Sequence, residues 1–399
     1  MRKPVRIIDF EDTEIAFRYK SGNAVRKANF IYSVVSNPWI SAIATGAVKL
    51  ALRLRLPVEP IIKSTVFELF CGGESIEETD AAISNLGKYN VHTILDYSVE
   101  GEASEAGFDQ VMRETILTIE KGATTSYIPF SVFKVTGLAS SDLLEKIHSR
   151  TLLTDDELAA YERVRLRVDT ICRKAHDLNV PVLIDAEETW IQDPIDQLAY
   201  DMMRRYNTEK AIVFNTYQMY RKQGLENLKT AREIAVKGYW LGAKVVRGAY
   251  MEKERVRAEV MGYESPIRRD KASTDQAFND SLEFCVKNLQ NLSVMCGSHN
   301  EQSNFYLTEL MQSNGIAPSD NRIWFAQLYG MSDNISFGLA SMGYNVAKYV
   351  PYGPVRSVMP YLLRRAAENT SVAGQSSREL VLISKELRRR KGSRKLREA

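Results

Sequence analysis

A lysine and an aspartate stand directly after short apolar runs, at positions where a buried strand rarely carries a charge. Lys134 follows the run FSVF, and Asp185 follows VLI. A lysine in such a place can act as a desolvated amine that forms a Schiff base with a carbonyl substrate. It can equally act as a fixed cation that binds a carboxylate. The spacing leaves both chemistries open.

Two adjacent arginines form a second chemical feature, in the segment YGPVRSVMPYLLRRAAEN. Tyr361, Arg364, Arg365 and Glu368 fall at i, i+3, i+4 and i+7, which places them on one face of a helix. Paired guanidinium groups bind a planar carboxylate, and a neighbouring acid can orient them. The pattern indicates an anion clamp, with a surface helix that carries ion pairs as the alternative.

Hydrophobic patterning predicts the elements that position these residues. Eight short apolar runs, rich in Val and Ile, alternate with helical patterns. Runs that are apolar on both faces are typical of parallel strands buried between layers. Eight such strands with helical crossovers over ~270 residues predict an α/β protein with a (β/α)8 TIM-type barrel, and a doubly wound open sheet is the competitor. The runs begin at Val91, Ile128, Val180, Ala211, Ala243, Leu292, Arg322 and Asn345.

Each run ends in polar residues. The carboxyl ends of barrel strands converge on one face, and that face carries the active site. Any single one of these residues can also be a strand end that faces water. Together they predict a site at the carboxyl face, built from Asp96, Lys134, Asp185, Asn215, Arg247, His299, Asn300, Gln327 and Tyr349.

The patterning divides the chain into an N-terminal helical region over residues 1–90, a barrel over 91–375, and a C-terminal helix with a basic tail over 376–399. Apolar residues at helical spacing over 40–51 predict one of the early helices. The helices before residue 90 either pack on the barrel or contact a membrane. The basic tail is either a solvated end or a weak contact with anionic lipid. The polar segment 262–276 predicts a loop that folds over the site.

Composition and missing motifs exclude several classes of function. A net charge of +3, from 53 basic and 50 acidic residues, is too balanced for a dedicated nucleic-acid binder. The histidines and cysteines show no zinc-ligand or CxxC spacing, so no metal is expected. No glycine fingerprint of a dinucleotide-binding domain occurs. The longest apolar run is too short to span a membrane, and the first residues resemble no signal or transit peptide. A cytoplasmic protein is therefore expected, in peripheral contact with the inner face of a membrane at most.

Eight short motifs follow one another between about residue 90 and residue 375: FKVTGLA, LIDAEE, FNTYQMY, KVVRGAY, GSHN, AQLYGM, KYVPYGP and YLLRRAAEN. In this order they resemble the proline dehydrogenase family. The resemblance implies a monofunctional flavoenzyme that oxidises L-proline to Δ1-pyrroline-5-carboxylate. It also implies FAD bound in a distorted (β/α)8 barrel without a Rossmann domain, and electrons passed to a quinone or a similar acceptor. It leaves the oligomeric state open.

The resemblance also implies roles for single residues on the substrate side. Lys134 matches the lysine that binds the substrate carboxylate, and Tyr349 matches the tyrosine against the edge of the proline ring. Leu328 matches the apolar residue under the ring, and Glu100 matches a glutamate that gates the pocket. The implied catalytic residues are Asp185, Lys244 and Lys134. The implied substrate-binding residues are Lys134, Asp185, Ala249, Leu328, Tyr349, Tyr361, Arg364, Arg365 and Glu100.

On the cofactor side, the resemblance places Lys244 near the flavin N5, where bacterial members often carry arginine. This departure resembles the eukaryotic type, and a lysine there favours the anionic reduced flavin. Asn215 stands where many members have glutamine, and Lys271 and Thr274 match the family only loosely. The implied FAD-binding residues are Ala186, Asn215, Lys244, Arg247, Gly248, Ala249, Lys271, Thr274, His299, Asn300 and Glu368.

Two other functions compete with this interpretation. A class I aldolase-like lyase would use Lys134 as its Schiff-base amine. A catalytically inactive barrel would serve as a scaffold, although decay would have no reason to keep a lysine, an aspartate and two arginines together. The absorbance spectrum separates these functions, because only a flavoenzyme is yellow.

Overall fold

The computed structural model describes residues 8–37, 39, 46–47, 54, 57–99, 104–371 and 375–398. Glu100 lies outside these ranges, and so does most of the helix that the sequence predicts over residues 40–51. Residue 368 lies in a described helix, but its side chain is outside the described part of the chain. Predictions about these positions stay predictions.

Eight parallel strands form a closed barrel in the order β1 to β8. Closure is made by β1 and β8, which pair along their whole length from Val91 opposite Val346 to Tyr97 opposite Tyr352. The (β/α)8 barrel is thereby confirmed, and the doubly wound open sheet is excluded. The strands are β1 (Val91–Tyr97), β2 (Phe130–Lys134), β3 (Val182–Asp185), β4 (Val213–Gln218), β5 (Leu241–Val246), β6 (Leu292–Gly297), β7 (Ile323–Leu328) and β8 (Val346–Tyr352).

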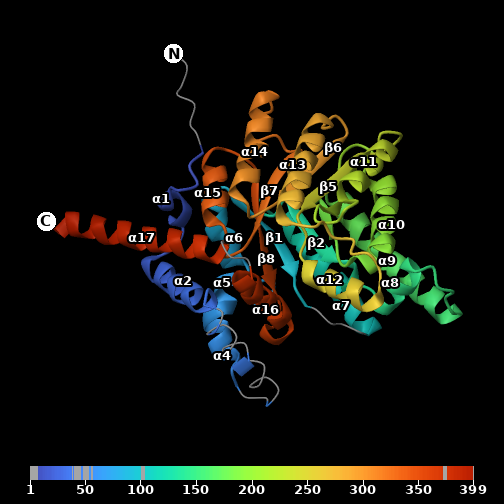
Figure 1. Cartoon of the computed structure of the whole chain (residues 1–399), viewed down its shortest axis with the longest axis horizontal. Coiled ribbons are helices and arrows are strands. Elements are labelled where there is room, and N and C mark those ends of the chain that lie inside the picture. The colour runs from blue at the N-terminus through green and yellow to red at the C-terminus, as the bar shows by residue number, and fades with distance from the viewer. Residues whose placement is uncertain are drawn as a thin grey trace.

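Helices between successive strands surround the barrel (Figure 1). The predicted loop at 262–276 is partly wrong, because its second half begins a helix at Lys271. The first half is bound to the loop after β4 through Arg268 N to Tyr220 O at 2.7 Å. The helices are α7 (Glu105–Ala123), α8 (Ser141–His148), α9 (Asp155–Asp177), α10 (Thr189–Tyr206), α11 (Gly224–Ala235), α12 (Met251–Met261), α13 (Lys271–Lys287), α14 (Glu301–Ser313), α15 (Asp333–Ser341) and α16 (Val355–Ser371).

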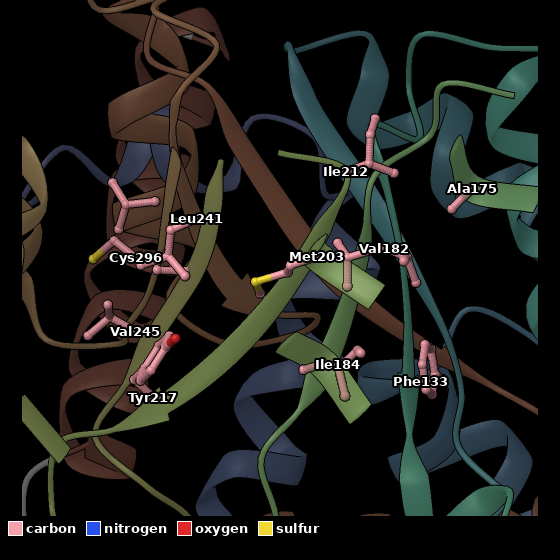
Figure 2. Packing of buried hydrophobic residues seen from close by; sticks show 14 of the residues in the cluster. Phe133, Ala175, Val182, Ile184, Met203, Ile212, Tyr217, Leu241, Val245 and Cys296 are labelled. Carbon is pink, nitrogen blue, oxygen red and sulfur yellow. The ribbon is translucent and has the colours of Figure 1, made fainter. Parts of the chain in front are cut away.

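The two faces of each strand contribute to different cores, because successive strand side chains point to opposite faces. The outward set packs against the helices. Figure 2 shows part of it, with Val182 and Ile184 of β3 near Met203 of α10. The inward set fills the centre of the barrel and consists of Ile94, Phe130, Val132, Leu183, Ala211, Phe214, Met295, Ala326, Ala347 and Tyr349. This alternation decides which polar residues at the strand ends face the interior.

Helices from both ends of the chain pack together beside the barrel, where α2 and α17 lie side by side (Figure 1). The predicted N-terminal helical region is thus confirmed. Their shared core includes Phe17, Tyr32 and Phe70 and continues into α16. No helix within the described ranges is long and apolar enough to cross a membrane. These terminal helices are α1 (Thr13–Phe17), α2 (Gly22–Val35), α4 (Glu59–Ile62), α5 (Glu68–Phe70), α6 (Asp80–Gly87) and α17 (Gln375–Glu398).

The basic residues of α17 are not simply a solvated end. Arg389 and Arg390 both pair with Glu386, whose side chain is fully buried. Arg390 Nη2 also donates to Phe17 O at 2.8 Å, which satisfies a carbonyl at the end of α1. Arg389 Nη1 lies 3.0 Å from Glu14 Oε2 of α1, so both arginines attach α17 to the N-terminal helices.

Gly330 lies just after β7, where the backbone of α5 comes so close that a side chain would not fit. Its φ is +80°, and a Cβ there would lie 2.2 Å from Leu69 O. Gly343 has a similar φ of +83° but has nothing within 4 Å of the Cβ position. We expect both Gly→Ala changes to cost ~1–2 kcal/mol for the left-handed backbone. Gly330→Ala should lower the free energy of unfolding by a further ~1–3 kcal/mol because α5 must move.

Urea unfolding of the two variants and the wild type measures this difference. Gly343→Ala is the matched control, since it carries the conformational cost alone. Equal losses of stability in the two variants would show that the contact with Leu69 is not tight.

Candidate active site

The carboxyl ends of five strands carry an alternating row of acidic, basic and phenolic groups inside the barrel. Lys134 Nζ lies 3.9 Å from Asp96 Oδ2 and 3.7 Å from Asp185 Oδ2. Lys244 Nζ lies 2.5 Å from Asp185 Oδ1 and 2.8 Å from Tyr349 Oη. The row therefore runs from β1 through β2, β3 and β5 to β8. Each cation has a carboxylate beside it, which is what allows charges to lie in a barrel interior.

Lys244 is the most enclosed cation of this row, with 6% of its surface exposed. Its ammonium also lies 4.7 Å from the centre of the Tyr349 ring. Burial and the nearby Asp185 and Asp96 carboxylates raise the pKa of Tyr349 well above its usual range, so the phenol stays neutral and accepts from the ammonium. These bonds use two of the three N–H groups of Lys244. The third can meet a ligand at the carboxyl face.

Helix α16 brings further positive charge to the same face. Arg365 is 8% exposed, and its guanidinium carbon lies 5.3 Å from the centre of the Tyr361 ring. Burial raises the pKa of Tyr250, and the charges of Lys134 and Arg364 oppose that rise. The Tyr250 phenol therefore lies within the field of both the β2 lysine and the α16 arginine. The predicted anion clamp and the predicted lysine share one region.

Glu187 is a buried carboxyl group to which the sequence analysis gave no role. Its carboxylate accepts from Thr136 N at 3.0 Å and from the Thr136 hydroxyl. Its own N–H donates to Gln192, and its carbonyl accepts from Gln218 Nε2 at 2.8 Å. Burial raises the pKa of Glu187 to about 7, against the Thr136 bonds and the charge of Lys134. Glu187 thus connects the ends of β2, β3 and β4.

A signal for Glu187 exists in the sequence. It is the third residue of the DAEE motif, two positions after Asp185. Side chains two residues apart in a strand point to the same face, so Glu187 points inward like Asp185 if the alternation continues past the end of β3.

Asn215 does not join this group. It lies on the outward face of β4, and its Nδ2 donates to Asp196 of α10 at 2.8 Å. The inward positions of β4 are Phe214, Thr216 and Gln218, because the strand alternates. Counting that alternation from the apolar residues of FNTYQ would have favoured Gln218 over Asn215. Gln327 is outward on β7 for the same reason and donates to Ser298 O.

Arg247 lies just after β5 and is held by three neighbouring elements. Its Nε, Nη1 and Nη2 donate to Asp275, Ser298 and Ser303 at 2.7, 2.8 and 2.9 Å. Its guanidinium carbon also lies 4.3 Å from the centre of a phenylalanine ring in α13. These bonds occupy the guanidinium inside the protein, so its observed role is to fix the end of β5.

Other residues of the predicted flavin set lie after β5, after β3 and on α13. Gly248 has a φ of +125°, and a Cβ there would lie 2.4 Å from the Tyr220 ring. Ala249, next along the chain, is exposed, and Ala186 after β3 is half-buried. On α13, the Lys271 ammonium bonds Asp275 at 2.5 Å while most of its side chain is exposed, and Thr274 is buried.

His299 and Asn300 follow β6. His299 Nδ1 lies 2.9 Å from Ser332 Oγ, and its Nε2 accepts from Leu328 N at 3.4 Å. Burial and the charges of neighbouring basic residues lower the pKa of His299 to about 3, so the imidazole is neutral. Asn300 caps α14 by accepting from Ser303 N at 2.9 Å. Leu328 itself is the last residue of β7 and faces the barrel interior.

Taken together, the carboxyl face presents buried cations, neutral hydrogen-bonding groups and an apolar wall above a filled barrel core. Among the described side chains, no group of three or more histidines, cysteines and acids could hold a metal ion. The fold and this face are those of a (β/α)8-barrel enzyme, whose active site lies at the carboxyl ends of the strands.

The chain is similar to known proteins of one kind. The family model described as proline dehydrogenase matches residues 79–378. A protein named proline dehydrogenase 1, mitochondrial, from Dictyostelium discoideum is 34% identical over an alignment of 384 residues, which covers 85% of this chain and 67% of that protein. The carbapenem antibiotics biosynthesis protein CarD of Pectobacterium carotovorum is 35% identical over 329 residues, 82% of this chain and 85% of that protein. The chain therefore belongs to the proline dehydrogenase family.

Other relatives are much longer than this chain. Human mitochondrial proline dehydrogenase 1 is 41% identical over 256 residues, and the match spans 63% of this chain and 42% of that protein. The solved structure of proline utilization A from Bdellovibrio bacteriovorus has a TM-score of 0.70 and 20% identity, covering 91% of this chain and 37% of that one. That likeness agrees with the fold. The expected cytoplasmic location is wrong, because the Dictyostelium and human relatives are both named as mitochondrial proteins.

The buried Glu187 carboxyl predicts a pH-dependent term in stability. Its pKa is about 7 in the folded protein and 4.5 in its ordinary state. The folded state therefore binds this proton more tightly, and the stabilisation is complete below pH ~4.5 and is lost as the pH rises through ~7. In Glu187→Gln this loss is absent. The free energy of unfolding of the variant, relative to wild type, should rise by on the order of 3 kcal/mol from pH 4.5 to 8.

Urea unfolding of both proteins across this pH range measures the effect. The informative quantity is how the difference in free energy of unfolding between variant and wild type changes with pH. Its absolute value is not informative, because the amide alters the Thr136 bonds at every pH. The Glu379 carboxyl, with its own pKa raised to about 7 by burial and by Asp333, is present in both proteins and cancels. A difference that stays constant with pH would contradict the assignment.

Proposed function

We propose that this chain oxidises L-proline to Δ1-pyrroline-5-carboxylate with FAD as the hydride acceptor. Family membership supports proline oxidation, the first step of proline breakdown. The observation that carries the proposal at the level of residues is the row from Asp96 to Tyr349, which joins the predicted carboxylate-binding Lys134 to the predicted flavin-side Lys244 through Asp185.

The residues of this face fit a flavin by their chemistry. When bound, FAD accepts the hydride from the ring carbon beside the proline nitrogen. Lys244 offers a buried N–H and a positive charge, which stabilises negative charge that develops next to it. We assign Lys244, Gln218, His299 and the exposed backbone at Ala249 to the cofactor side. Gln218 replaces Asn215 in this role, since Asn215 faces α10.

On the substrate side, Lys134, Arg364 and Arg365 bind the carboxylate. Three cations around one carboxylate hold the ring in a single orientation and so convert binding energy into positioning. Their field also lowers the pKa of the substrate amine. That effect matters because the amine must lose its proton before a hydride can leave the adjacent carbon. Leu328 supplies an apolar surface under the ring.

The resemblance further implies that a quinone-type acceptor takes the electrons, and the proposal includes it. Exposed apolar side chains in the N-terminal region support a peripheral membrane contact near such an acceptor. Phe30 of α2 is 66% exposed, Ile61 of α4 is 66% exposed, and Trp39 is 82% exposed.

The test of this function combines a spectrum with one substitution on α16. We expect the purified protein to be yellow and its flavin absorbance to bleach when L-proline is added without oxygen. Arg365→Met should lower kcat/KM for proline by roughly 30- to 5,000-fold, because loss of a desolvated charged contact costs on the order of 2–5 kcal/mol. Its flavin content should stay normal.

Arg356→Met is the matched control, because Arg356 lies on the same helix, is exposed and pairs with Glu59. A colourless protein, or one that borohydride traps on Lys134 with a carbonyl substrate, would overturn the flavoenzyme in favour of the lyase. Wild-type kinetics in Arg365→Met would overturn the carboxylate assignment alone.

Tyr349 provides a separate prediction about selectivity. A hydroxyl on ring carbon four of the substrate would press on this phenol, and a packed pocket resists added volume by ~1–3 kcal/mol. We therefore expect a preference for proline over 4-hydroxyproline of roughly 5- to 150-fold in kcat/KM. Tyr349→Ser should narrow this preference. Tyr349→Phe should keep it, because it removes only the oxygen that accepts from Lys244.

The measurement is kcat/KM for proline and for 4-hydroxyproline, with one artificial acceptor, in the wild type, Tyr349→Ser and Tyr349→Phe. If Tyr349→Ser and Tyr349→Phe are equally selective, the ring of Tyr349 is not the wall of the pocket.

A further inference from the structure

The loop after β7, residues 329–332, is held by both ends of the chain. From α2, Tyr32 Oη donates to Gly330 O at 2.7 Å. From α17, the Glu379 carboxylate accepts from Ser332 N at 2.5 Å. From β8, Lys348 donates to Met331 O. The segments outside the barrel therefore fix the backbone of a loop that begins directly after Leu328.

Ser332 adopts a conformation that needs such support. Its φ and ψ are 51° and 44°, in the left-handed region that residues with a side chain rarely occupy. A residue in this region persists where its surroundings determine it. Ser332 is fully buried, and its N–H is bound by Glu379 while its Oγ lies 2.9 Å from His299 Nδ1.

The protonation of His299 follows from the same contacts. Its Nε2 accepts from Leu328 N, so the proton of the neutral imidazole lies on Nδ1 and is donated to Ser332 Oγ. The Leu328 N–H therefore selects the tautomer, and Ser332 Oγ, which accepts the Nδ1 proton, helps to fix the orientation of the ring. Because Leu328 bonds the opposite ring nitrogen, Ser332 and Leu328 are coupled through His299.

A buried ion cluster lies next to the Ser332 loop. Asp333 Oδ2 accepts from Lys20 Nζ and Tyr19 Oη, both at 2.8 Å, and its Oδ1 lies 2.9 Å from Lys348 Nζ. Two cations thus meet the Asp333 carboxylate in a region where Lys348 is completely buried. Glu379 is also buried, and one of its oxygens accepts from the Ser332 amide.

We propose that Glu379 is a positioning residue for the proline pocket: by binding the Ser332 amide it fixes His299 and Leu328. The part of this inference that concerns proline rests on the proposed function. The simpler reading is that Glu379 only attaches α17 to the body of the protein. Glu386 offers the matched control for that reading. It lies two turns further along α17, is equally buried, and contacts Arg389 and Arg390 rather than the loop.

The experiment compares Glu379→Ala, Glu379→Gln and Glu386→Ala with wild type, each as the holoenzyme labelled with 15N-histidine. The chain has only four histidines, and the His299 signals are identified by their loss in His299→Asn. The 15N shifts report which ring nitrogen carries the proton. Proline KM and kcat are measured on the same samples.

We expect Glu379→Ala to shift the His299 nitrogen signals and to raise KM for proline about tenfold with little change in kcat, as loss of a binding interaction does. Glu379→Gln keeps an acceptor oxygen for the Ser332 amide and should restore both readouts. Glu386→Ala should leave the His299 signals unchanged. Ser332→Gly is a second route, since glycine tolerates the left-handed backbone and removes only the hydroxyl that meets His299.

Unchanged His299 signals in both Glu379→Ala and Ser332→Gly would overturn the inference. Equal shifts in Glu379→Ala and Glu386→Ala would also overturn it, in favour of simple attachment of α17. If Glu379→Ala does not fold, Ser332→Gly and Glu379→Gln decide the question. A wild type without flavin or proline oxidation would remove the proposed function, yet the nitrogen signals would still report whether Glu379 positions His299.

Discussion

A buried ammonium group must be paired, and the pairing of Lys244 organises the carboxyl face of this barrel. Lys244 lies on β5 with 6% of its surface exposed, and its charge is compensated by Asp185 on β3. Asp185 in turn is shared with Lys134 on β2, whose other neighbour is Asp96 on β1. Removing Asp185 would leave the Lys244 cation without its carboxylate in a low-dielectric interior, which is more costly than losing a surface ion pair. The positions of four strand ends are thus linked by one constraint.

The same row bears on the choice between two chemistries for Lys134. A Schiff-base lysine must be neutral to attack a carbonyl, and enzymes achieve this by burial or by placing another cation beside it. Lys134 instead has carboxylates at 3.7 and 3.9 Å on two sides, which favour its charged form. A lysine held in its charged form is suited to binding a carboxylate.

Sequence reasoning reached the parts of this protein that depend on local pattern. The eight strands and the barrel follow from apolar runs, and Lys134 and Asp185 follow from their places at strand ends. Tyr349 lies within β8 rather than at its end. Asn215 was misplaced because a strand end was considered without counting the two-residue alternation, which directs Asn215 to Asp196 and Gln218 inward. The predicted loop at 262–276 was partly a helix because the Asp270 side chain caps α13. Arg389 and Arg390 resemble a solvated tail in the sequence because, besides Glu386, their partners are Glu14, Phe17 and Lys20, at least 370 residues away.

Contacts between the two ends of the chain cannot be predicted from local sequence patterns. The family model matches residues 79–378, yet Tyr19, Lys20 and Tyr32 lie before this range and Glu379 lies just after it. These residues contact Asp333 and the loop after β7, within the barrel itself. Closure of the sheet needs only the strands, because each edge is paired. The loops at the carboxyl face have no such constraint, and a loop with left-handed residues at Gly330 and Ser332 must be held from outside. In this chain the two terminal regions fold against each other and supply that support, so the elements farthest from the active site in sequence help to define its shape.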